Sequence, residues 1–190
     1  MKSKFCPPSI LFLVLIPVSL LASNNSIKYP PLQVGAGYNY VADTGDLSEY
    51  LNSDNGIAFF VNTPVIVGSF EFAYTNEGYK KNTNQGADYS AWSWAFGWNY
   101  PLELYKGILI SPGFHVGSYK MYFDIPSDNE FEKDETENYI ELLSRVSIPL
   151  TGNFSIYCEI NKKRIYTYHP IDITNIHAGL VLTIGKQGNK

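Results

Sequence analysis

One histidine, one serine and one glutamate of this 190-residue chain best match the groups used in acyl-transfer chemistry. They are His115, Ser118 and Glu141. A serine nucleophile needs a base within hydrogen-bond reach and a third group that orients the base. Successive side chains of a strand point to opposite faces, so the odd spacing places His115 and Ser118 on opposite sides of an extended segment. The sequence therefore does not favour a catalytic triad, and no catalytic residue is assigned.

A second group of ionisable residues lies in segments whose large apolar residues alternate with polar or small ones. Its members are Glu71, Glu141, Arg145 and Glu159, with His115 and His177 as further polar members. All of them fall on the face opposite the large apolar side chains. Charged groups away from water need partners because their desolvation is costly, so these residues predict a network of salt bridges. A gated ion path is the functional alternative.

The segment 89–100 shows which element positions such residues. Trp92, Trp94, Phe96, Trp98 and Tyr100 alternate with small or polar residues, which is the two-residue period of a β-strand. A water-soluble sheet would have to cover all of these aromatic side chains. A strand around a narrow lumen instead needs large residues towards lipid and small ones inside. The pattern predicts a lipid-facing transmembrane strand.

The same alternation occurs in further segments, which gives about eight strands in all. These segments are 34–40, 57–62, 66–74, 108–117, 140–148, 154–160 and 176–184. Short connections (63–64, 101–107, 149–153) alternate with long ones (42–55, 76–88, 124–136, 162–173), as in an outer-membrane barrel. The predicted fold is all-β: a transmembrane, antiparallel, up-and-down β-barrel of about eight strands, whose interior is just filled by side chains.

The first 22 residues have the features of a cleavable export signal: two lysines, then an apolar run too short to span a membrane as a helix. We divide the chain into a signal peptide (1–22), an N-terminal segment (23–32), a barrel domain (33–185) and a C-terminal tail (186–190). Loss of Lys2 and Lys4 leaves 12 of the 14 basic residues against 18 acidic ones, so the net charge changes from -4 to -6. Nucleic acid is therefore not an expected partner.

Two of the long connections carry clusters of charge. The acidic cluster comprises Asp124, Asp128, Glu130, Glu132, Asp134, Glu135 and Glu137, around Lys133. It lacks the central glycine of an EF-hand, so we expect a solvated acidic loop without a metal ion. Lys162, Lys163 and Arg164 begin the fourth long connection and could contact the phosphates of lipopolysaccharide or simply flank the membrane. No motif in the chain calls for a cofactor.

Over residues 33–185 this pattern resembles the small eight-stranded OmpA/OmpX-like outer-membrane barrels of diderm bacteria. The resemblance implies an outer-membrane location, insertion by the barrel-assembly machinery, and contact with outer-membrane lipid and lipopolysaccharide. It also implies that outward aromatic side chains face lipid or form girdles at the two interfaces. These are Tyr38, Tyr40, Phe72, Tyr74, Trp92, Trp94, Phe96, Trp98 and Tyr100. The family usually ends on an aromatic residue, whereas here a polar tail follows the last strand.

We therefore expect a non-enzymatic barrel that supports the envelope or presents its long loops for adhesion or recognition. Three alternatives stay open. One is an outer-leaflet, lipid-modifying enzyme resembling the lipid A deacylases, with His115, Ser118 and Glu141 as its candidate residues. The second is a narrow ion channel, and the third is a soluble periplasmic barrel or sandwich whose aromatic face is covered by a partner.

Overall fold

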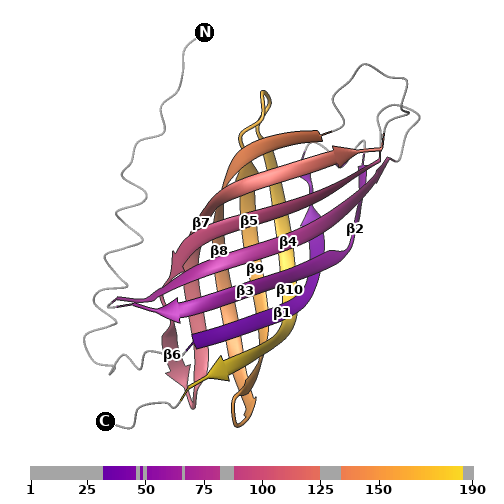
Figure 1. Cartoon of the computed structure of the whole chain (residues 1–190). Coiled ribbons are helices and arrows are strands. Elements are labelled where there is room, and N and C mark those ends of the chain that lie inside the picture. Colours follow the sequence, from indigo (N-terminus) through magenta and orange to yellow (C-terminus); the bar gives the residue numbers. More distant parts are fainter. Residues whose placement is uncertain are drawn as a thin grey trace.

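A single antiparallel sheet of ten strands forms the described part of the chain in the computed structural model (Figure 1). The structure describes residues 32–45, 48, 51–65, 67–81, 88–124 and 134–185. The strands are β1 (Leu32–Asp43), β2 (Leu51–Asp54), β3 (Gly56–Pro64), β4 (Ser69–Lys81), β5 (Tyr89–Asn99), β6 (Leu102–Tyr105), β7 (Ile108–Phe123), β8 (Asp134–Thr151), β9 (Phe154–Ile165) and β10 (Ile171–Ile184). The predicted signal peptide and C-terminal tail lie outside the described residues, as does the segment 23–32 except for Leu32.

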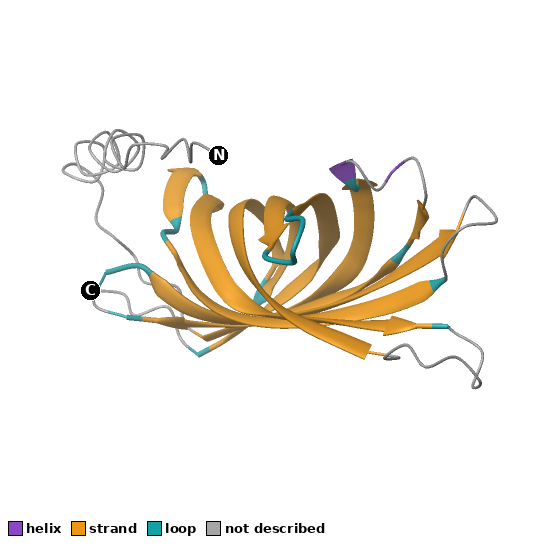
Figure 2. Cartoon of the chain, turned by 90° about the horizontal axis from the view of Figure 1, so that it is seen from above, coloured by secondary structure: helices purple, strands orange, loops and turns teal. Residues whose placement is uncertain are grey.

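The eight longer strands close into a barrel. Each pairs with its neighbours along the chain, β4 pairs with β5, and β1 pairs with β10 to complete the circle. The two short strands extend this sheet, because β2 continues the line of β3 along β4, and β6 pairs with β7. The strands run obliquely and curve around the lumen (Figures 1 and 2). The predicted closed, antiparallel, eight-stranded β-barrel is confirmed.

The outer face of this sheet is apolar and its inner face is polar, which is the reverse of a water-soluble barrel. Leu142 is 60% exposed on the outer face, whereas its neighbour Glu141 is 4% exposed inside the barrel. The same contrast holds on β4, where Phe72 is 39% exposed and Glu71 is fully buried. Large apolar side chains thus cover the outside, while charged and amide side chains fill the inside. In the described ranges, no helix is long and apolar enough to cross a membrane.

The strands are longer at the long-loop end than the sequence pattern predicts. β4 continues to Lys81 and β7 to Phe123, while β8 already begins at Asp134. β9 continues to Ile165, so the expected connection 162–173 shrinks to residues 166–170. The apolar alternation stops where the polar rim begins, but the backbone ladder needs no apolar side chain and continues. The predicted loop boundaries at this end were therefore wrong.

At the opposite end, the first short turn is also displaced from its predicted position. β3 includes Thr63 and Pro64, and the turn lies at 65–68, where Val65 N donates to Gly68 O at 3.1 Å. Gly68 has a φ of 80°, a conformation that other residues rarely adopt. Ile66, predicted to begin the next strand, lies outside the described residues. Within the expected long connection 42–55, Leu51 begins the short strand β2.

Candidate functional site

The centre of the lumen holds one guanidinium between two carboxylates. Arg145 on β8 donates from Nη1 and Nη2 to the two carboxylate oxygens of Glu71 on β4, at 2.7 Å each. Its Nε donates to Oε2 of Glu159 on β9 at 2.8 Å. All three side chains are buried. Arg145 lies directly opposite Glu159 in the β8–β9 register, whereas Glu71 comes from a strand that pairs with neither. Barrel closure is therefore what brings the bidentate pair together.

Two histidines complete what we call the arginine cluster. Its members are Glu71, Glu141, Arg145, Glu159, His115 and His177. His115 Nδ1 lies 2.9 Å from Glu141 Oε1, and its Nε2 lies 3.2 Å from Glu71 Oε1, an ion-pair distance without hydrogen-bond alignment. His177 Nδ1 lies 2.9 Å from Glu159 Oε1. An imidazole carries a proton on both nitrogens only when it is cationic, so a cationic His115 would offer one to each carboxylate.

Aromatic rings pack around the same guanidinium. The ring of Phe60 lies 3.6 Å from Arg145 Cζ, and that of Tyr157 lies 5.6 Å away, both within the range of cation–π attraction. Gly35, on the neighbouring strand, makes room for Phe60, because a Cβ atom there would lie 2.1 Å from the Phe60 ring. Gly97 makes room for His115 in the same way, with a Cβ-to-ring distance of 2.0 Å. Small residues facing the lumen thus permit large ones opposite them.

A second buried ion pair, which we call the lysine cluster, lies nearer the long-loop end. Lys163 Nζ on β9 lies 2.9 Å from Glu77 Oε1 on β4. The hydroxyls of Tyr79 and Tyr119 donate to Glu77 Oε2 at 2.7 and 2.8 Å, and Asn175 Nδ2 donates to Oε1 at 3.1 Å. Each of these five side chains is at most 2% exposed. This carboxylate is therefore fully engaged by donors from four strands.

Little free space lies beside the arginine cluster. The enclosed void beside the arginine cluster measures about 10 Å³, which is room for about one water molecule. Arg145 and Lys163 face four glutamates, so the two clusters together have a charge of -2 when both histidines are neutral and are balanced when both are protonated. Chemically, the arrangement is a plug cross-linked by ion pairs.

Part of this plug was missed in the sequence. Lys163 was predicted in a surface loop, and Glu77 in the connection 76–88, yet both side chains are buried inside the barrel. Both predictions were wrong because the strands continue beyond their apolar residues. The sequence does contain a signal for their burial, because residues an even number of positions apart share a face of a strand. Lys163 is four residues from Glu159, and Glu77 is six residues from Glu71.

Most of the predicted lipid-facing aromatic residues lie on the outer surface. Tyr38, Tyr40, Phe72, Trp94 and Phe96 are exposed, and Tyr74, Trp92 and Trp98 are half-buried among neighbouring rings. Tyr100 differs, because it is only 7% exposed. β5 ends at Asn99, so the alternation that would point Tyr100 outwards stops one residue before it.

The structure separates the residues considered for acyl transfer. His115 lies in the lumen against Glu141, whereas Ser118 lies on the opposite face of β7, across from Trp94.

Of the acidic residues predicted in one loop, Asp134, Glu135 and Glu137 instead belong to β8. The members outside the described residues are Asp128, Glu130, Glu132 and Lys133.

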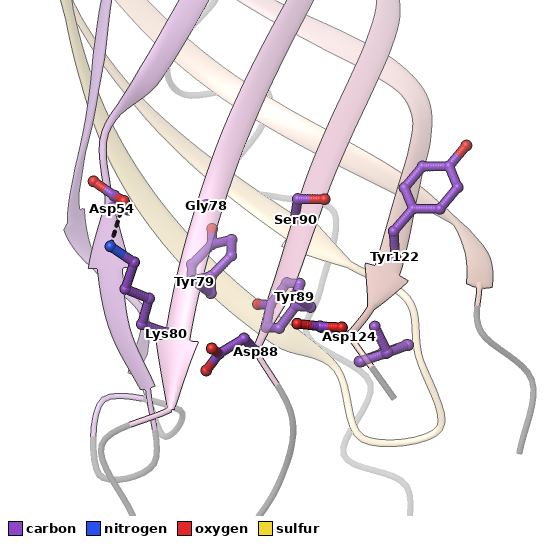
Figure 3. A pocket seen from close by; sticks show the side chains of 10 residues that line it. Asp54, Gly78, Tyr79, Lys80, Asp88, Tyr89, Ser90, Tyr122 and Asp124 are labelled. Carbon is purple, nitrogen blue, oxygen red and sulfur yellow. Dashed lines mark ion pairs between the residues drawn. The ribbon is translucent and has the colours of Figure 1, made fainter. Parts of the chain in front are cut away.

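A recess of about 400 Å³ opens at the long-loop end, beside the ends of β4, β5 and β7 (Figure 3). Tyr89, Tyr122, Asp88 and Asp124 contribute to its lining. Asp54 Oδ2 pairs with Lys80 Nζ at 3.3 Å on its β2 side. The Asn55 backbone N–H and the Lys80 ammonium lower the pKa of Asp54 below its usual value. The recess is thus wider than the lumen void and carries both aromatic and charged groups.

Solved structures of small outer-membrane proteins share this fold. Neisserial surface protein A (NspA) has a TM-score of 0.58 and 13% identity, over 80% of this chain and 97% of that one. Ail, the attachment invasion locus protein of Yersinia pestis, has a TM-score of 0.54 and 10% identity, over 82% and 99%. OprG from Pseudomonas aeruginosa has a TM-score of 0.54 and 10% identity, over 84% and 98%. No family model and no curated protein sequence matches the chain. The likeness confirms the small OmpA/OmpX-like barrel fold.

Proposed function

We propose that this chain is a non-enzymatic, integral outer-membrane β-barrel that presents a recognition surface at its long-loop end. The observation that carries the proposal is the exchange of inside and outside: Leu142 and Phe72 are exposed, while Glu71 and Arg145 are buried. In water, such an outer face would keep a large apolar area in contact with solvent. Surrounding lipid removes that cost, and closure of the barrel satisfies the backbone hydrogen bonds.

The plugged lumen supports a scaffold role over a channel. The charged side chains of the arginine and lysine clusters are paired with one another, and the void beside the arginine cluster has room for about one water molecule. A conducting path would require several of these ion pairs to separate together, at a cost of several kcal/mol for each unpaired buried charge. We therefore expect flat traces in planar-bilayer recordings, and stable unitary conductance steps would contradict the scaffold role.

The rim supports the recognition role. The recess lies at this end, and the connection between β9 and β10 carries Tyr168, which is 94% exposed. Exposed tyrosines at protein surfaces are well suited to bind partners, because they combine an apolar ring with a hydroxyl. NspA is by name a surface protein and Ail an attachment protein. We extend this kind of role to the present chain, with export by the signal peptide and insertion by the barrel-assembly machinery.

The first test is fractionation of a diderm host that expresses the full-length chain. We expect the protein in the outer membrane after an alkaline wash, with a gel mobility that changes on boiling. Release into the periplasmic fraction would overturn the membrane placement. Mass analysis of lipid A from cells with and without the gene then tests the enzymatic alternative, and we expect the same acyl pattern in both.

Recognition itself is tested with cells that display the barrel on their surface. Binding to an array of glycans and extracellular proteins is compared between the native chain and a variant whose connection 166–170 is replaced by glycine and serine. A ligand bound by the native chain and lost in the variant supports the proposal. No difference between displaying and non-displaying cells across the array contradicts it.

A further inference from the structure

The basic run at the end of β9 is divided between the two faces of the barrel. Lys163 points inwards and is fully buried in the lysine cluster. Lys162 and Arg164 point outwards and are exposed. The run that the sequence suggested as one basic surface patch therefore supplies one cation to the lumen and two to the outer wall.

Lys162 lies where the outward apolar residues of β9 end, while on β8 they continue to Ile140, opposite Arg164. On its own strand it follows Ile160, which is 54% exposed, and across β8 it lies opposite Leu142, which is 60% exposed. Across β10 it lies opposite Thr174. Within the described residues, no carboxylate lies within ion-pair distance of Lys162. Two other outward-facing lysines near the long-loop end, Lys80 and Lys120, each form an ion pair with a carboxylate.

Arg164 is also only weakly engaged. Its Nε lies 3.8 Å from Asp172 Oδ1, which is too long for a hydrogen bond, and its side chain is 56% exposed. The next carboxylate along this edge, Asp43 on β1, accepts a hydrogen bond from Gly45 N. The guanidinium therefore has donors free to meet an anion from outside the chain.

We infer that Lys162 and Arg164 bind the phosphate group of a membrane lipid in the leaflet at the long-loop end. Alternate residues of a strand lie roughly 6.6 Å apart, so both side chains can reach one phosphate. Guanidinium and ammonium groups are the usual protein partners of phosphate, and Thr174 adds a hydroxyl donor. The acyl chains of the lipid would lie along Ile160 and Leu142, on the side of the phosphate that faces the short-turn end of the barrel. This inference rests on the proposed membrane placement.

The test uses the full barrel in nanodiscs of phosphatidylethanolamine that contain a small fraction of diphosphorylated lipid A. Native mass spectrometry counts the lipid A molecules retained by the native chain and by two variants. K162Q/R164Q removes the proposed site. K80Q/K120Q removes the same number of outward cations at the same end, and serves as the matched control. The boiling-dependent gel shift verifies that both variants are folded.

We expect K162Q/R164Q to retain at least roughly tenfold less lipid A, which corresponds to about 1.4 kcal/mol, and the control to retain the native amount. Dephosphorylated lipid A should bind the native chain as weakly as the variant binds the phosphorylated form. Millimolar inorganic phosphate should compete poorly, because it lacks the acyl chains. Equal retention by native chain and K162Q/R164Q, or equal loss in both variants, would overturn the inference while leaving the membrane placement intact. Failure to enter nanodiscs would count against the placement itself.

Discussion

Replacement of Arg145 by methionine should destabilise the barrel strongly. The change removes three hydrogen bonds to carboxylates at 2.7 to 2.8 Å and leaves Glu71 and Glu159 buried without their main counter-charge. Breaking one side of a buried pair costs about 3–5 kcal/mol. Glu71 keeps His115 at 3.2 Å and Glu159 keeps His177 at 2.9 Å, so we expect a loss near the lower limit of that range.

Urea unfolding of the barrel in lipid vesicles, followed by tryptophan fluorescence and by the boiling-dependent gel shift, measures this loss. K120M is the control, because its pair with Asp134 is at the exposed rim and exposed pairs contribute about 0–1 kcal/mol. The triple variant R145M/E71Q/E159Q should recover part of the stability, since it removes the uncompensated charges. A loss below about 1 kcal/mol for R145M would refute the reasoning. Failure of the triple variant to recover stability would show that the arginine acts by packing on Phe60 rather than by charge.

Three further predictions test which side chains face the lumen and which face outwards. K163M should cost about 3 kcal/mol in the same unfolding assay, whereas K162M, one residue away but outward, should cost less than about 1 kcal/mol; similar values would mean that the two faces are misassigned. G97A should cost at least about 1–3 kcal/mol, because its Cβ would lie 2.0 Å from the His115 ring and 2.1 Å from the Phe114 carbonyl oxygen. G97A/H115A should be milder than the sum of the two single variants, since H115A removes the contact with the ring but not the contact with the backbone. The tryptophans of β5 should be quenched strongly by brominated lipid chains, and an unchanged emission would argue that β5 does not face lipid.

The arginine cluster shows how far the sequence could predict the site. Alternation alone placed Glu71, Glu141, Arg145 and Glu159 on one face, because the face of a strand residue depends only on whether its number is odd or even within that strand. Which carboxylate meets the arginine depends on the register between strands. Glu159 lies opposite Arg145 in a neighbouring strand, but Glu71 lies 74 residues away in the chain. Such a pairing has no local signal.

Lys163 shows where the sequence pattern misled. The outward apolar residues that mark β9 stop at Ile160, but the strand continues to Ile165, because its hydrogen-bonded ladder does not require apolar side chains. Lys163, which was predicted in a loop, is therefore the buried counter-ion of Glu77. Tyr100 is the opposite case. The apolar alternation continues to this residue, but β5 ends at Asn99, and the ring of Tyr100 is buried.

The amino-acid sequence by itself determined that the chain is a barrel with an apolar outside and a charged inside, because alternation in steps of two is a local property of the strand. Only the tertiary structure decided where the strands end, which charges meet and how much space they leave. Those depend on the closure and stagger of the strands, which bring together residues from distant parts of the chain. The division of Lys162, Lys163 and Arg164 between the outer face and the lumen depends on both. Alternation separates the three side chains, and the length of β9 decides that alternation applies to them.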